Sequence, residues 1–186
     1  MGRKSTFEDR VIFAAVGAEI ARNGTITLQD LSARTGVSIG SLYHRYASRE
    51  ALLAAAWYDA VRRSQSGFLA ALRGASLETG KHAALATPRF CRAEHDAAII
   101  LACCRQSEFL KPNTPDELAL AIAGVNDEAK DEIAAFARRV DRPLINCHLA
   151  LVAYPLAAVK LFLPDRAVPE SIDVEIGKAY DAAMRA

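Results

Sequence analysis

Residues 36–49 contain side chains that are well suited to contacting a nucleic acid. Arg45 and Arg49 are cations that can reach phosphates, and the residues before them are small or carry hydrogen-bonding groups. Small residues at the start of a helix let its backbone approach the edges of base pairs, while Tyr, His and Arg side chains reach the DNA backbone. The candidate contacts in this group are Ile39, Gly40, Ser41, Tyr43 and His44.

Two short helices are expected to position these side chains. Thr27 can cap a helix that ends at Gly36, and Ser38 can cap a second helix over residues 39–46. Gly36 suits the turn between them, because such a position often requires a positive φ or no side chain. A small apolar core would fix the angle between the helices, formed by Leu31, Val37 and Leu42. The segment therefore predicts a helix-turn-helix.

The stretch GVSIGSLYHRYASREALL, residues 36–53, resembles the signature of the tetracycline-repressor (TetR) family of transcriptional regulators, and the similarity extends over residues 12–57. The resemblance implies an all-α fold, with an N-terminal three-helix DNA-binding domain (residues 1–50) joined by a long fourth helix to a helical ligand-binding and dimerisation domain (residues 51–186). The family's DNA-facing positions fall on Thr27, Ser38, Ile39, Gly40, Ser41, Tyr43, His44 and Arg49.

The resemblance also implies a function and partners. The chain is expected to be a sequence-specific DNA-binding regulator, a repressor released from double-stranded operator DNA by a small-molecule effector, and a homodimer through its last two helices. No catalytic residue, cofactor or metal is expected. The alternatives are a helical enzyme and an interaction module without regulated DNA binding.

The amino-acid composition agrees with an all-helical protein, and the low net charge indicates that any contact with a nucleic acid involves a local surface. Alanine, the best helix former, is abundant, while residues that favour strands are spread thinly. The formal net charge is only +1, so no overall field draws the molecule to DNA or to a membrane. Residues 1–10 lack the features of a signal peptide, and the chain is expected to be cytoplasmic.

Apolar periodicity and capping residues predict the remaining helices. The long helix is expected to begin after Ser48 and to reach Arg73. A loop is expected at residues 111–114. Thr114 and Pro115 would then start a helix that continues past Gly124 and keeps one apolar face as far as Val140. The other expected helices cover residues 5–22, 76–86, a segment restarted at 87–88, 96–106, 144–163 with a kink at Pro155, and 169–185.

The stretch 144–163 is long enough to span a bilayer, but it contains Asn146, His148 and Lys160, which are costly in lipid. It is therefore expected to be a soluble helix, with no membrane partner. Its apolar character on nearly all sides predicts a two-fold pairing with a second copy. The expected effector site is mainly apolar, with candidate lining residues Trp57, Phe90, Asn146, Cys147 and Tyr154.

Cysteine and histidine pairs offer alternative chemistry with weaker support. Cys91 and His95 have the spacing of two metal ligands on one helical face, but no further ligand is suitably spaced. Adjacent Cys103 and Cys104 could sense oxidants, although free Cys is commonly buried. Cys147 next to His148 suggests a nucleophile, yet adjacent helical residues do not face each other. The four cysteines are expected to be free thiols.

Overall fold

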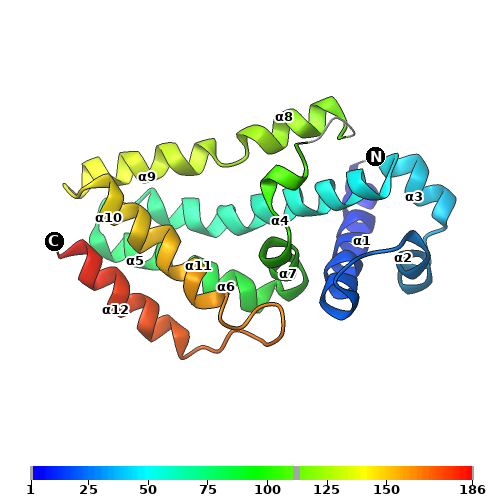
Figure 1. Ribbon diagram of the computed structural model, residues 1–186. Helices are drawn as coiled ribbons and strands as arrows, with labels where there is room; N and C mark the ends of the chain where they lie inside the picture. Colours follow the sequence, from blue (N-terminus) through cyan, green and yellow to red (C-terminus); the bar gives the residue numbers. More distant parts are fainter. Residues whose placement is uncertain (1, 111–113, 186) are drawn as a thin grey trace. The chain divides into compact units, whose positions relative to one another are not determined.

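The computed structural model describes residues 2–110 and 114–185, and the regular elements of this part of the chain are all helices, without strands (Figure 1). The N-terminal helices are α1 (Gly2–Asn23), α2 (Leu28–Thr35), α3 (Ile39–Tyr46) and α4 (Arg49–Leu72). The middle of the chain forms α5 (Leu77–Ala84), α6 (Ala86–Ala93), α7 (His95–Cys103), the 3-10 turn η1 (Gln106–Glu108), α8 (Asp116–Gly124) and α9 (Asp127–Arg139). The C-terminal elements are α10 (Leu144–His148), the π-helical segment η2 (Leu149–Ala153), α11 (Tyr154–Val159) and α12 (Ile172–Met184).

The described residues form two compact units from interleaved segments. The first unit is built from the described residues within 1–60 and 94–124. It therefore contains α1, α2, α3, the first half of α4, α7 and α8. The second comprises residues of 61–93 and 125–186. Because its residues 49–60 and 61–72 fall on opposite sides of this division, α4 contributes to both units.

In the first unit, α1 packs against both α2 and α7, and α2 packs against α3. A side chain at Gly17 would overlap the backbone carbonyl of Asp96, so α1 and the start of α7 are in close backbone contact. The ring of Trp57 in α4 packs against that of Phe109 in a tilted arrangement, with ring centroids 5.4 Å apart. Residues within 94–124 are therefore part of the same packed unit as the helix-turn-helix.

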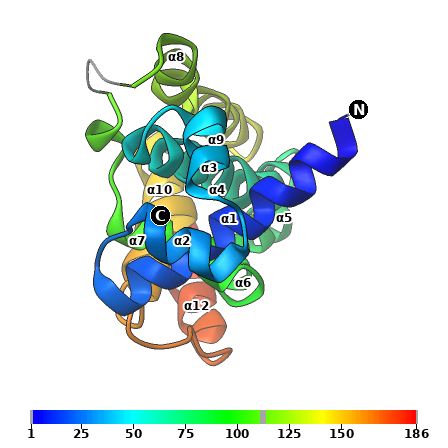
Figure 2. The ribbon, with the colours of Figure 1, turned by 90° about the vertical axis from the view of Figure 1, so that its right-hand side faces the viewer.

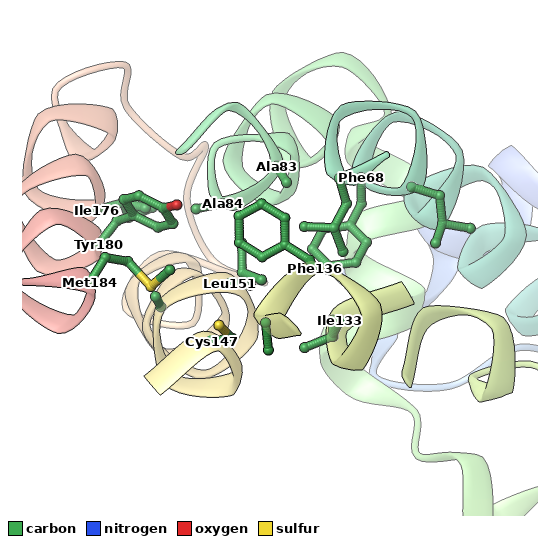
Figure 3. Close-up of a cluster of buried hydrophobic side chains, with 14 residues drawn as sticks. Phe68, Ala83, Ala84, Ile133, Phe136, Cys147, Leu151, Ile176, Tyr180 and Met184 are labelled. Atoms are coloured by element: carbon green, nitrogen blue, oxygen red, sulfur yellow. The ribbon is translucent and has the colours of Figure 1, made fainter. Parts of the chain in front are cut away.

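In the second unit, a buried cluster joins α4, α5, α9, α10, η2 and α12 (Figure 3). The ring of Phe136 lies in the middle of this cluster and is fully buried. A side chain at Gly80 would overlap both Phe136 and the hydroxyl of Tyr180, which shows how closely α5 meets its neighbours. Tyr180 donates a hydrogen bond to the carbonyl of Leu77 over 2.8 Å.

The prediction of a single helix from Thr114 to Val140 is wrong, because the chain forms two helices there. The first ends at Gly124, and the second begins at Asp127. The Thr114 hydroxyl donates to the carbonyl of Phe109 over 2.6 Å, and the first of these helices begins at Asp116. The expected loop at 111–114 lies, except for Thr114, outside the described residues.

Two further boundaries differ from expectation. The long C-terminal stretch ends its helical part at Val159, and residues before Pro155 form a π-helical segment in which the Tyr154 N–H bonds the carbonyl of Leu149. That wider turn accommodates Pro155, which has no N–H to donate. The last helix begins at Ile172 rather than at Pro169. No helix in the described part of the chain combines the length and apolar character needed to cross a membrane.

Candidate DNA-binding site

Local hydrogen bonds begin and end the two short helices where the sequence predicts. The hydroxyl of Thr27 accepts from the N–H of Asp30 over 3.1 Å at the start of α2. Gly36 ends that helix with φ 73°, and its N–H donates to the carbonyl of Ser32. The hydroxyl of Ser38 accepts from the N–H of Ser41 over 3.1 Å at the start of α3. These bonds define the turn between the helices.

An apolar core fixes the two helices against each other. Leu31 and Leu42 have 0% and 1% of their surface exposed, and Ile26, just before α2, has 2%. Val37 is half-buried at the edge of this core. The residues predicted to set the helix angle therefore lie where the helices meet, which leaves the opposite side of α3 free.

The free side of α3 carries the expected polar surface. Ser38, Gly40, Ser41, Tyr43 and His44 are exposed, whereas Ile39 is half-buried. An open hollow on this surface is lined by Ser38, Gly40, Ser41, His44 and Arg45. A side chain added at Gly40 would meet only the Ser38 hydroxyl, at 4.0 Å, so the backbone of α3 is accessible at this point. Figure 2 shows α3 with α2 and α1.

The end of α3 is tied to α1 through Asp9. Arg45 Nε lies 2.9 Å from Asp9 Oδ1, and the Tyr46 hydroxyl donates to the same oxygen. Burial raises the pKa of Tyr46, and the neighbouring Asp9 carboxylate raises it further, so the phenol keeps its proton. The sequence gives no signal for Asp9, because its partners lie more than thirty residues later in the chain.

A buried carboxylate links α1 to α2. Glu19 is 1% exposed and accepts hydrogen bonds from Arg34 Nε at 2.8 Å and from Asn23 Nδ2 at 2.8 Å. Arg22 Nη2 adds a contact of 3.0 Å. The Arg34 hydrogen bond is the main cause of a lowered Glu19 pKa, which keeps the carboxylate charged. The sequence signal for this residue was an acidic side chain within the apolar face of the helix, between Val16 and Ile20.

Arg49 forms hydrogen bonds within the chain although its side chain is partly exposed. Its Nη1 donates to the carbonyl of Ile26 over 3.2 Å, and its Nε donates to Glu50 Oε1 over 3.0 Å. Arg49 is 48% exposed. The guanidinium thus holds the segment before α2 against the start of α4 while part of it faces solvent.

The candidate effector residues are divided between the two units. Trp57 lies in the first unit, and the other candidates lie in the second. Cys147 is fully buried in the cluster around Phe136, and Asn146 Nδ2 donates to the carbonyl of Ala183 over 3.0 Å. Tyr154 is 38% exposed and Phe90 is half-buried.

The cysteine pairs have surroundings that do not favour the alternative chemistries. All four cysteines are free. Burial raises the pKa of Cys91 to about 11 and that of Cys104 to about 12, so these thiols stay protonated at neutral pH. Cys91 is buried whereas His95 is exposed. Within residues 2–110 and 114–185, no three His, Cys, Asp or Glu side chains are grouped to hold a metal ion.

Comparison with known families identifies the helix-turn-helix. Residues 18–56 match the profile described as "Bacterial regulatory proteins, tetR family". This segment is a tetR-family DNA-binding domain. It covers α2, α3, the end of α1 and the start of α4, the elements that form the polar surface described above. The chain therefore contains the DNA-binding helix-turn-helix of tetR-type transcriptional regulators. A comparison with curated protein sequences finds no match.

Solved structures of tetR-family regulators share the fold over nearly the whole chain. The regulator PfmR from Thermus thermophilus has a TM-score of 0.68 and 20% identity, covering 94% of this chain and 97% of its own. A regulator from Marinobacter aquaeolei has a TM-score of 0.70 and 17% identity, with coverage of 98% and 97%. The fatty acid degradation regulator FadR from Bacillus halodurans has a TM-score of 0.71 and 17% identity, with coverage of 99% and 96%. The all-α fold expected from the sequence is confirmed.

Proposed function

We propose that this tetR-type protein is a ligand-responsive repressor that binds a pseudo-palindromic operator as a homodimer and is released by a small molecule. The exposed polar surface of α3, with its accessible backbone at Gly40, is the observation that carries the proposal. Such a surface has no packing role within the first unit. Its residue types match those that read base edges and contact phosphates.

In the proposed complex, α3 enters the major groove. Ile39, Gly40 and Ser41 at its N-terminal end lie near base edges. Tyr43, His44 and Arg49 contact phosphates on either side, and Thr27 and Ser38 at the helix N-termini contribute further hydrogen bonds. The two half-sites lie on one side of the duplex, about one helical turn or a multiple apart.

Exposed apolar residues on α10, α11 and α12 and in the turn just after α11 support the dimer. Single exposed apolar residues are ordinary, but several of them on helices that pack against one another, as α12 does with α10 and α11, favour an interface. Ala153 and Ala157 are also exposed and would let a second copy approach closely. We call this surface the C-terminal face, and its large apolar residues are Leu144, Ile145, Tyr154, Leu156, Leu161 and Val174.

The response to ligand is proposed to act through α4. This helix begins at Arg49, directly after the helix-turn-helix, and its end at Leu72 is fully buried in the core of the second unit. A ligand that displaces the second half of α4 therefore changes the position of the two DNA-binding domains in the dimer. A shift of a few ångströms would separate one domain from its groove. By linkage, a ligand that weakens operator binding 100-fold binds the DNA-free form about 100-fold tighter, a coupling of roughly 2.7 kcal/mol.

The decisive experiment is to sequence the DNA that is retained by the purified protein and to test the enriched sequence in gel shifts. A two-fold symmetric sequence bound as a dimer is the expected result. Compounds that stabilise the fold in a thermal-shift screen are then added to the complex. If none of them loosens it and the emission of Trp57, the single tryptophan, does not change, the protein is a constitutive DNA-binding protein instead.

A further inference from the structure

Gln65, in the second half of α4, has a buried oxygen without a hydrogen-bond donor among the described residues. The side chain is 8% exposed. Its Nε2 donates to the carbonyl of Val125 and to Asn126 Oδ1, each over 3.0 Å. Its Oε1 is buried and accepts nothing from the described part of the chain.

The orientation of this amide is set by its partners. A peptide carbonyl can only accept, so the group that faces Val125 O must be the NH₂ group of Gln65. Rotating the amide by 180° would place two acceptor oxygens against each other. The unpaired atom is therefore the oxygen, and what it lacks is a donor.

The surroundings of Gln65 are apolar. Val61, Phe68 and Leu69 lie one helical turn before or after it on α4, and all are buried. Val125, at the break between α8 and α9, is 5% exposed. An acceptor in such surroundings costs free energy unless a donor reaches it. A buried acceptor in a largely apolar setting is also how ligand sites orient a small molecule.

Other candidate positions in the second unit are filled by protein atoms or already bonded. Cys147 lies in the filled cluster around Phe136, and a single added carbon at Gly80 would already overlap Tyr180 and Phe136. Asn146 uses its amide N–H on the backbone of α12. Among the described residues of this unit, the side-chain polar atom that is both buried and unpaired is Gln65 Oε1.

We propose that Gln65 is the hydrogen-bonding residue of the effector site, and that the effector is a mostly apolar molecule with an O–H or N–H donor, which Oε1 accepts. This inference rests on the proposed function and specifies the site at which the ligand acts. A ligand whose only polar group is a carboxylate does not fit, because it would place an anion against an acceptor. The Nε2 group keeps its bonds at the α8–α9 break, so a bound donor connects directly to α4 and to that break.

The site can be tested with matched probes on the full-length protein. The pairs phenol and anisole, indole and 1-methylindole, and 2-naphthol and 2-methoxynaphthalene each differ by a methyl group that replaces the donor hydrogen. Benzoate serves as the acceptor-only anion. The readouts are the side-chain NH₂ signals of Gln65 in ¹H–¹⁵N spectra, assigned by their loss in Gln65→Leu, and the thermal midpoint.

We expect donor probes to shift the Gln65 signals and to bind about tenfold tighter than their methylated partners, the effect of one hydrogen bond to a buried acceptor. Benzoate should have neither effect. Gln65→Leu should abolish the preference for the donor. The matched control is Gln106→Leu, because Gln106 Nε2 likewise donates to a backbone carbonyl, that of Ile122 over 2.7 Å, but in the first unit. This control should keep the preference.

Equal binding within every pair, or unshifted Gln65 signals with all probes, would overturn the proposal. So would water cross-relaxation showing that a long-lived water remains on this amide in the presence of every probe. These comparisons use the wild-type protein and do not depend on how Gln65→Leu folds. Operator binding is measured separately without probes. Its absence would refute the repressor function and leave the ligand result intact, whereas operator binding with no response at Gln65 would refute only the site.

Discussion

Arg34 of α2 donates to the buried carboxylate of Glu19 in α1, with Nη2 2.7 Å and Nε 2.8 Å from Oε1. This pair holds the first helix of the helix-turn-helix onto α1. Because Asn23 donates to the other oxygen of the same carboxylate, the charge is well satisfied although the side chain is buried. The position of α2, and through the shared core that of α3, therefore depends on one acidic residue that has no contact with DNA in the proposed complex.

We predict that Glu19→Gln lowers the thermal midpoint and weakens operator binding, because Arg34 loses its ionic partner. The pKa of Glu19 is lower in the folded protein than its unfolded value of about 4.3. The stabilisation is therefore complete above about pH 4.3 and is lost as the pH falls through the folded pKa. The stability difference between the two proteins should be constant near neutrality and should shrink in acid, as measured by urea unfolding at several pH values.

The control is Glu175→Gln, since Glu175 and its partner Lys178 are both largely exposed. An exposed pair contributes at most about 1 kcal/mol, so this variant should stay close to the wild type. A Glu19→Gln protein as stable as the control at neutral pH would show that the buried carboxylate does not fix α2.

The sequence predicted the helix-turn-helix well because its boundaries depend on local interactions. Thr27 and Ser38 each bond an N–H three residues later, and such contacts can be deduced from residue types and spacing. The long helix α4 was predicted for the same reason, with the Ser48 hydroxyl accepting from the N–H of Ala51. The polar surface of α3 followed from these boundaries and from helical periodicity.

Tertiary contacts were the part that the sequence could not supply. The apolar pattern between Leu118 and Val140 continues through Gly124, so one helix was expected. In the structure the carbonyl of Val125 accepts from Gln65, sixty residues earlier, and the helix is interrupted there. Residue type alone points to candidate effector residues, and it cannot distinguish a core position such as Cys147 from an exposed one such as Tyr154.

Arg49 is predicted to contribute to DNA affinity without contributing to base preference. Arg49→Ala should weaken binding to all sequences alike and reduce the log–log salt slope by roughly 0.9 for each phosphate that is no longer neutralised. Ser41→Ala should instead change the preferred base at one position of each half-site. Fluorescence anisotropy at several salt concentrations measures both effects.

Because Arg49 also bonds the carbonyl of Ile26, the alanine variant is expected to lose some thermal stability. Arg49→Lys retains the charge but not the guanidinium geometry, and it serves as the control. It should recover the salt slope while the midpoint stays lowered. An unchanged slope in Arg49→Ala would limit the role of Arg49 to holding the segment before α2.

The C-terminal face is predicted to form the dimer. Ile145 is 63% exposed and Leu161 is 68% exposed, so replacing either by Glu leaves the core of one copy unchanged. Burying a charge without a partner at an interface is costly, and these variants should be monomeric at micromolar concentration by light scattering. Operator affinity should fall, because one DNA-binding domain then binds alone.

Leu120 of α8 provides the matched control, because it is 76% exposed and lies outside the C-terminal face. Leu120→Glu should remain a dimer with wild-type operator affinity. If the wild-type protein itself is monomeric at this concentration, or if Leu120→Glu dissociates as readily as Ile145→Glu, the C-terminal face is not the interface.

We predict that substitution of Gly40 affects operator binding without lowering the stability of α3. A side chain at this position meets only the Ser38 hydroxyl, at 4.0 Å, so Gly40→Ala introduces no clash within the protein. Alanine favours the helix over glycine by up to about 1 kcal/mol, and the variant should be equally or more stable in thermal unfolding. In the proposed complex the backbone of α3 approaches base edges here, and the added methyl group should hinder that approach. Operator binding should therefore weaken while stability does not.

Gly67 of α4 is the corresponding control, since it is exposed, helical and has no atom within 4 Å of the position of a side chain. Gly67→Ala should gain similar stability and keep wild-type operator affinity, measured on the same operator at the same salt concentration. Because both substitutions add one methyl group to an exposed helical glycine, any difference in DNA binding arises from where the methyl group points. Equal affinity in the two variants would mean that the backbone at Gly40 does not approach DNA, and the proposed docking of α3 would be wrong.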